Sequence, residues 1–124
     1  MAVNLQFNQH LLPIAGVRLA TLNAGIRYKG RDDLLLLELA EGSSCAAVFT
    51  LNAFCAAPVI VSRDNIAKAN PRYLLVNAGN ANAGTGEPGL AAAKACCAAL
   101  AQAGACTPEQ VLPFSTGVIG QQLP

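Results

Sequence analysis

The segment 73–104 constrains the fold of this chain most strongly, because a short apolar run, a loop of glycine and asparagine and an alanine-rich stretch follow one another there. The apolar run Tyr73–Asn77 predicts a strand. Pro88 is favoured in the first turn of a helix and Gly104 just after a helix end, so we predict a helix from about Pro88 to Gln102. A strand, a tight loop and a helix in this order are typical of a layered α/β fold.

The residues after this helix predict one helical turn and a last strand. Thr107 and Gln110 have the spacing of a capping box, in which each side chain bonds to the backbone of the other residue. The apolar run Val111–Phe114 then predicts a strand. This strand would deliver the small residues 115–117 to its carboxyl end.

The first half of the chain predicts mainly strands. Gly25–Tyr28 and Leu34–Leu39 flank a polar turn, which indicates a hairpin or a pair of neighbouring strands. Leu34–Leu37 is apolar at every position, which is typical of a strand covered on both faces. Further expected elements are strands at Ala46–Thr50 and Val59–Val61 and a short helix at Asp64–Lys68. The order of elements predicts an α/β (α+β) fold with a mixed, partly antiparallel sheet layered with helices, in a single domain over residues 1–124.

The composition excludes several classes of protein. Apolar residues make up 53% of the chain and charged residues only 12%, which favours a packed core and a surface that meets a partner chain. A net charge of +1 without a basic cluster argues against binding of nucleic acid. The sequence contains no run of about 18 apolar residues, so we predict no membrane span. Met1–Leu5 lacks the basic start and apolar core of a signal peptide, so we expect a cytoplasmic protein.

The five cysteines and the single histidine do not form a metal-binding pattern, because no C-x-x-C spacing occurs. We expect reduced cysteines that act as small core residues, and no metal. Cys96 and Cys97 are adjacent on the predicted helix and cannot face the same way, so at most one of them belongs to the core.

The string Gly84–Gly89 has the form G-x-G-x-x-G, which raises the alternative of a nucleotide-binding module. In a dinucleotide fingerprint the first glycine directly follows the strand, but Gly84 comes seven residues after Asn77. Pro88 also lacks the N–H group that a helix start would offer to a phosphate. We therefore favour a rigid turn of small residues, in which the asparagines of 77–82 bond the loop to its neighbours. Such a turn would let the strand ending at Asn77 pack close to the strand that carries residues 116 and 117.

Thr116 and Gly117 are candidate catalytic residues. A threonine hydroxyl and an unshielded glycine N–H can together stabilise the negative oxygen of a tetrahedral acyl-transfer intermediate. The spacing alone is more typical of an ordinary strand-to-helix loop with a serine or threonine cap.

Four segments together resemble the N-terminal part of the ornithine acetyltransferase family, the bifunctional glutamate N-acetyltransferases of arginine biosynthesis. They are Arg31–Leu34, Ala46–Thr50 with Ala56–Val59, Leu75–Ala83, and Ser115–Gly120 with Leu123 and Pro124. The resemblance follows the order of the chain over nearly its whole length.

The resemblance implies an enzyme that is made as one precursor and cuts itself before a threonine. This threonine, as the first residue of a β chain, would carry an acetyl group from N-acetylornithine to glutamate. Acetyl-CoA as a second donor stays open, and no cofactor is implied. Thr116 and Gly117 match the family's oxyanion-hole pair.

The resemblance also implies that the nucleophile lies beyond Pro124. We therefore expect this chain to be an N-terminal, α-chain fragment that is inactive alone and pairs with the β chain of the same precursor, in an α2β2 assembly. A non-catalytic structural domain of the same fold is the remaining alternative.

Overall fold

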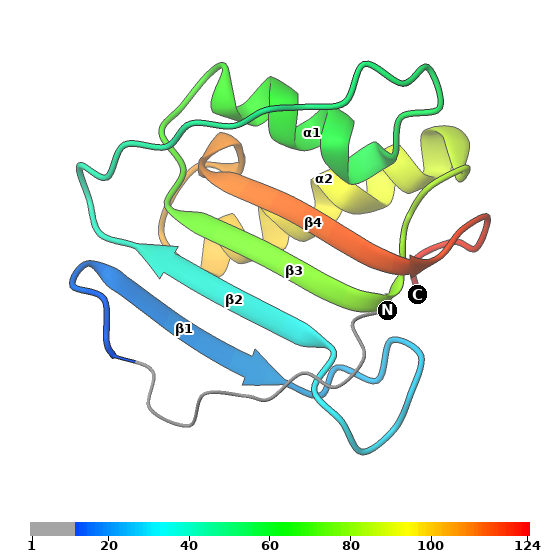
Figure 1. Cartoon of the computed structure of the whole chain (residues 1–124), viewed down its shortest axis with the longest axis horizontal. Helices are drawn as coiled ribbons and strands as arrows, with labels where there is room; N and C mark the ends of the chain where they lie inside the picture. Colours follow the sequence, from blue (N-terminus) through cyan, green and yellow to red (C-terminus); the bar gives the residue numbers. More distant parts are fainter. Residues whose placement is uncertain (1–11) are drawn as a thin grey trace.

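The computed structural model describes residues 12–124, which form one mixed sheet and two helices (Figure 1). The elements are β1 (Val17–Leu22), β2 (Leu34–Leu39), α1 (Ala57–Ile66), β3 (Tyr73–Asn80), α2 (Gly86–Ala103), the 3-10 turn η1 (Pro108–Gln110) and β4 (Val111–Val118). The strand order is β1-β2-β3-β4, with antiparallel pairing of β1 with β2 and of β2 with β3, and parallel pairing of β3 with β4. The predicted mixed, partly antiparallel α/β fold is confirmed.

The unit from β3 to β4 follows the sequence prediction closely. Parallel strands need a crossover connection, and α2 with η1 supplies it. The capping box is present in η1, where the Thr107 N–H donates to Oε1 of Gln110 at 3.1 Å. Both strands run further than predicted, to Asn80 and Val118, so the residues 115–117 lie within β4 and not in a loop after it.

The first half of the chain departs from the prediction. The strand expected at Gly25–Tyr28 is wrong, and the partner of β2 is β1, which the sequence analysis did not identify. The backbone at residues 24–26 bonds instead to a side chain: the carboxylate of Asp33 accepts the N–H groups of Ala24 at 2.7 Å and Ile26 at 2.6 Å. A local acceptor of this kind competes with the ladder of a sheet.

Two further strand predictions are wrong. Ala46–Thr50 has no regular secondary structure, and Val59–Val61 lies inside α1, which also contains the start of the predicted short helix at Asp64. Valine and isoleucine lower helix propensity only slightly, so tertiary contacts decide. These contacts are made by Ser62 and Asn65 of α1, which donate to the backbone oxygens of Pro113 and Val111, each at 2.8 Å.

The helices cover only one face of β3 and β4, and no helix lies beside β1 (Figure 1). The core consists of small and medium side chains from α1, α2, β3 and β4: Ala57, Val61, Tyr73, Ala93, Cys97, Ala101 and Val111. Every residue of β2 is half-buried, so the prediction that this strand is covered on both faces is wrong. The continuous leucine run of β2 places leucines on both faces of a sheet that has helices on one face only.

Cys97 is the core cysteine of α2, with an exposed fraction of 1%, whereas Cys96 is half-buried. Burial, together with the neighbouring Cys96, raises the pKa of the Cys97 thiol to about 11. The expectation that at most one of the two belongs to the core is confirmed. All five cysteines are free thiols, but only Cys97 is buried, so the expectation that they act as core residues is wrong for the other four.

Residues 12–124 contain neither a membrane-spanning helix nor a cluster of metal-binding side chains. No helix in this range is long and apolar enough to cross a membrane. No group of three or more histidine, cysteine, aspartate or glutamate side chains there is placed to hold a metal ion.

Candidate functional site

Thr116 and Gly117 lie near the carboxyl end of β4 and are exposed. The preceding residue, Ser115, faces the helix side of the sheet, where its hydroxyl donates to Oδ1 of the buried Asn77. Because side chains alternate along a strand, Thr116 faces the side that carries no helix. Within residues 12–124 the Thr116 hydroxyl has no hydrogen-bond partner, so it is available to a ligand or another chain.

Gly117 pairs with Gly79 of β3 and leaves no room for a side chain. Its φ is +137°, and a Cβ at this position would lie 2.3 Å from the carbonyl carbon of Gly79 and 2.5 Å from the amide nitrogen of Asn80. Both contacts are with backbone, which cannot move aside, so position 117 accepts only glycine. The expected close packing of these two strands is confirmed, although the contact lies at Gly79 and not at Asn77.

The asparagines of β3 bond the strand end to its surroundings, as predicted. Asn77 donates to the backbone oxygen of Asn80 at 2.8 Å. Asn80 in turn donates to the backbone oxygens of Gln121 at 3.1 Å and Gln122 at 3.0 Å. Both asparagines are buried. The segment that follows β4 is thus held against the end of β3, beside Gly117.

A third asparagine, Asn82, joins the loop to α2. Its side chain is fully buried, donates to the backbone oxygen of Gly89 at 2.9 Å and accepts the Thr85 hydroxyl at 2.8 Å. Gly89 leaves no room for a side chain, since a Cβ there would lie 1.9 Å from Oγ1 of Thr85. The role of Gly89 is therefore close packing of α2 on the loop.

The other two glycines of the G-x-G-x-x-G string also have a structural explanation. Gly84 has a φ of +67° and lies against the ring of Phe54, and Gly86 has a φ of +60° at the start of α2. The hollow of about 280 Å³ beside them is walled by apolar side chains, Phe54 and Leu90 among them. Positive φ and close packing thus account for all three glycines without a phosphate.

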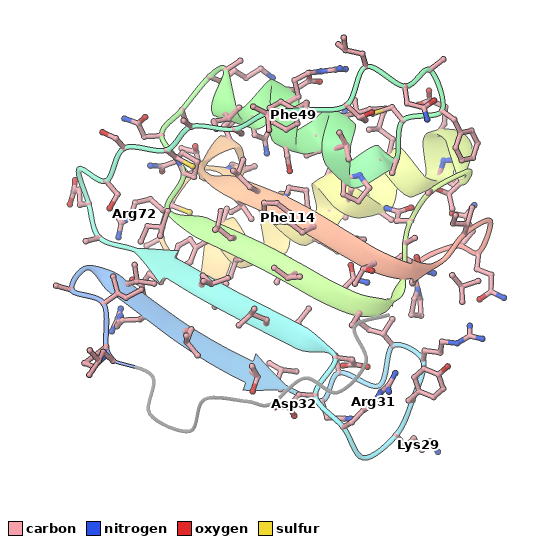
Figure 2. The ribbon with its side chains drawn as sticks, in the orientation of Figure 1. Lys29, Arg31, Asp32, Phe49, Arg72 and Phe114 are labelled. Carbon is pink, nitrogen blue, oxygen red and sulfur yellow. The ribbon has the colours of Figure 1, made fainter. Side chains whose placement is uncertain are left out.

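A larger cavity of about 310 Å³ lies between the segment 47–50, the start of α1 and β4. Two phenylalanines, Phe49 and Phe114, contribute to its walls, and Figure 2 shows them over α1 and β4 respectively. The cavity joins three of the segments that carry the family resemblance, 46–50, 56–59 and 115–120. The sequence analysis did not predict this cavity, because the path of segment 47–50 over α1 has no local signal.

The loop between β1 and β2 contains a buried carboxylate, that of Asp33. Asp33 is buried, with an exposed fraction of 4%. Burial acts to raise the pKa of its carboxyl group, but the hydrogen bonds from the backbone N–H groups of residues 24–27 outweigh it and hold the pKa below its usual value. In the sequence, Asp33 belongs to the polar turn before Leu34 and to the segment 31–34 of the family resemblance, and neither feature predicts its role.

Three basic residues, Arg27, Lys29 and Arg31, lie on the same loop together with Asp32 and Asp33. The guanidinium carbons of Arg27 and Arg31 lie 5.6 Å and 4.0 Å from the ring centre of Tyr28. Lys29 and Arg31 extend at the outer edge of the loop (Figure 2). Nη1 of Arg27 donates to Oε1 of Gln121 at 3.2 Å, so the cluster contacts the segment after β4. The cluster is confined to one loop.

Comparison with known sequences identifies relatives over almost the whole chain. The ArgJ family profile matches residues 18–124. The arginine biosynthesis bifunctional protein ArgJ of Methylococcus capsulatus is 62% identical over 114 residues, which are 92% of this chain and 28% of that protein. The protein of the same name from Pseudomonas syringae pv. tomato is 55% identical over 124 residues, covering all of this chain and 30% of its own length. The chain thus spans about 30% of the length of these relatives.

Two crystal structures share the fold. The arginine biosynthesis bifunctional protein of Bacillus halodurans superposes with a TM-score of 0.83 at 36% identity, over 89% of this chain and 58% of that one. The ornithine acetyltransferase of Mycobacterium tuberculosis, complexed with ornithine, superposes with a TM-score of 0.79 at 37% identity, over 89% of this chain and 60% of that one. The sequence match and the shared fold agree, and the chain belongs to the ArgJ family.

Proposed function

We propose that the protein containing this chain is a glutamate N-acetyltransferase that moves an acetyl group from N-acetylornithine to glutamate. Membership of the ArgJ family supports the reaction class, and the names of two relatives point to arginine biosynthesis and to ornithine. Acetyl-CoA is a further donor that the word bifunctional in the relatives' names leaves open. The setting would be cytoplasmic, as for other enzymes that act on free amino acids.

The observation that carries this proposal is the pair of exposed residues near the end of β4, Thr116 and Gly117. In the reaction a threonine hydroxyl of a β chain attacks the acetyl carbonyl, and the electron pair of the C=O bond moves to the oxygen. The Thr116 hydroxyl and the Gly117 N–H would donate to this oxygen. The proton of the threonine hydroxyl passes to the threonine's own α-amine and from there to the nitrogen of the departing ornithine as the C–N bond breaks. The acetyl ester that remains is attacked by the neutral amine of glutamate, whose proton returns through the same α-amine to the threonine oxygen as the ester bond breaks.

The open face of the sheet supports a β-chain partner. Opposite the helices, the paired strands present an apolar surface, which we call the open face: Leu19, Leu35, Leu37, Leu74, Val76 and Phe114. Leu19 and Phe114 are 68% and 43% exposed. Exposed apolar surface of this extent is typical of an interface. Since Thr116 lies on the same face, a β chain packed there would bring its threonine toward the two donors, and two such pairs would form an α2β2 assembly.

The proposal is tested by Thr116→Ala in the full-length protein. Loss of one oxyanion donor should lower kcat for acetyl transfer by about 10²–10³-fold, with little change in KM. Thr21→Ala is the matched control, because Thr21 is an exposed threonine of β1 whose pairing with Leu35 places it on the same face, at the far edge of the sheet. An unchanged kcat in the Thr116 variant would remove this residue from the oxyanion role, and a wild-type protein without acetyl transfer would overturn the function itself.

A further inference from the structure

Asp33 anchors the loop between β1 and β2 through both its side chain and its main chain. Its side chain accepts the N–H groups of Ala24 and Ile26 at 2.7 Å and 2.6 Å. Its main chain joins two strands, since its N–H donates to the oxygen of Leu22 at 3.1 Å and its oxygen accepts the Ala78 N–H at 2.8 Å. The carboxylate forms no ion pair within residues 12–124, where the structure has only the pair of Arg18 with Glu38. The negative charge of Asp33 is therefore used to hold the loop.

The held loop also lies against β3 at Gly79. A Cβ on Gly79 would lie 2.8 Å from Cβ of Arg27, and the next two nearest atoms also belong to Arg27. Gly79 has a φ of +109°, a conformation that glycine adopts without strain. Arg27 thus lies directly against the backbone of β3, one residue beyond the hydrogen bond from Ala78 to Asp33.

Gly79 in turn lies against Gly117. The three atoms nearest to a Cβ on Gly117 would be backbone atoms of Gly79 and Asn80, at 2.3–2.6 Å. Three contacts therefore run in series: the Asp33 carboxylate holds residues 24–26, Arg27 lies on Gly79, and Gly79 lies on Gly117. A shift of the loop would therefore move Arg27 relative to the backbone of Gly79, which pairs with Gly117.

We propose that Asp33 is a positioning residue for acetyl transfer, which acts through the loop and Gly79 to fix the direction of the Gly117 N–H. The inference rests on the proposed function of Gly117 as an oxyanion donor. A donor of this kind must be held to within about 0.5 Å to stabilise the transition state. A looser loop leaves the Gly117 N–H present but less well placed. We therefore expect kcat to fall less than it does when an oxyanion donor is removed.

The first test compares Asp33→Asn with Asp32→Asn in the full-length protein. Both variants remove one carboxylate charge from the same loop, but Asp32 is exposed and its side chain bonds only to the Thr21 hydroxyl. We expect Asp33→Asn to lower kcat about tenfold with KM changed less than twofold, and Asp32→Asn to change kcat less than twofold. A folded Asp33→Asn protein with wild-type kcat would overturn the inference. It would leave the proposed function intact if Thr116→Ala is still slow in the same assay.

The second test does not depend on whether Asp33→Asn folds. Arg27→Ala keeps the Cβ that touches Gly79 and removes the guanidinium group, whereas Arg27→Gly removes both. If the contact with Gly79 sets the Gly117 N–H, kcat of Arg27→Gly is at least about threefold below that of Arg27→Ala, with equal KM. Equal kcat values for the two variants would mean that the contact does not act on the site, and the inference would fail.

Discussion

The unit from β3 to β4 and the region that precedes it, residues 12–56, are built in different ways. In the first, buried asparagines and close glycine contacts lock two parallel strands and a helix together. In the second, β1 has no residue that is fully buried, and several large apolar side chains, such as Val48 and Leu51, lie almost completely in solvent. The first region is stabilised by its own contacts, while the second depends on a few anchors such as Asp33.

This difference follows the chemistry that we propose. An oxyanion donor needs a backbone that cannot move, and a Cβ on Gly117 would clash with the backbone of β3. A surface that receives a β chain needs exposed apolar side chains, and β1 and β2 supply part of it. The Asp33 loop connects the two regions, since it belongs to the second and touches the first.

Gly117→Ala should have the largest effect of the substitutions that test this difference between the two regions. The new Cβ would lie 2.3 Å from backbone, at a φ of +137°. Overpacking and backbone strain together should lower the free energy of unfolding by roughly 3–5 kcal/mol and abolish activity in the full-length protein. Urea denaturation measures the first effect and the acetyl-transfer assay the second.

Gly120→Ala is the control for this substitution. Gly120 also has a positive φ, +79°, but no atom lies within 4 Å of a Cβ there. Strain alone should then lower the free energy of unfolding by about 1 kcal/mol. Equal losses for the two variants would mean that the close approach of β3 and β4 is not what demands glycine at position 117.

Asn82→Ala tests the same region with a smaller expected effect. The substitution leaves the hydroxyl of Thr85 and the backbone oxygen of Gly89 without their partner in a buried position. It also places alanine at a φ of 46°. We expect the free energy of unfolding to fall by about 2–3 kcal/mol, measured by thermal or urea denaturation. Asn70→Ala, at an exposed position, should change the free energy of unfolding by less than about 0.5 kcal/mol. If Asn82→Ala lowers the free energy of unfolding no more than Asn70→Ala does, the assigned role of Asn82 is wrong.

The same contrast explains which parts of the fold the sequence could predict. The β3–α2–η1–β4 unit has local signals, such as the Pro88 start, the Gly104 end and the capping box of Thr107, and all three predicted their elements. The segment Val59–Val61 has local β propensity, but its buried contacts with β4 make it helical. The sequence did not predict strand β1, because apolar and polar residues alternate only weakly in it. Its pairing in register with β2 also has no local signal.

The residues of the candidate site also differ in whether the sequence could predict them. Thr116 and Gly117 could be proposed from a short contiguous motif and its resemblance to a family. The role of Asp33 could not be proposed from a local motif. It depends on a contact between Arg27 and Gly79, which are 52 positions apart in the sequence. The cavity at Phe49 and Phe114 was missed for the same reason.

Leu19→Ser should have the smallest effect and tests the second region. Leu19 is 68% exposed, so serine removes little buried surface and should change the free energy of unfolding of this chain by less than about 0.5 kcal/mol. In the full-length protein the same substitution should weaken packing of a β chain on the open face, which a lower melting temperature of the complete protein would report. Lys94→Ser, at an exposed position of α2, controls for surface changes away from the open face. A loss in this chain as large as that of Asn82→Ala would mean that β1 is already part of a closed core. The contrast between the two regions would then be wrong, because the open face would be stabilised from within.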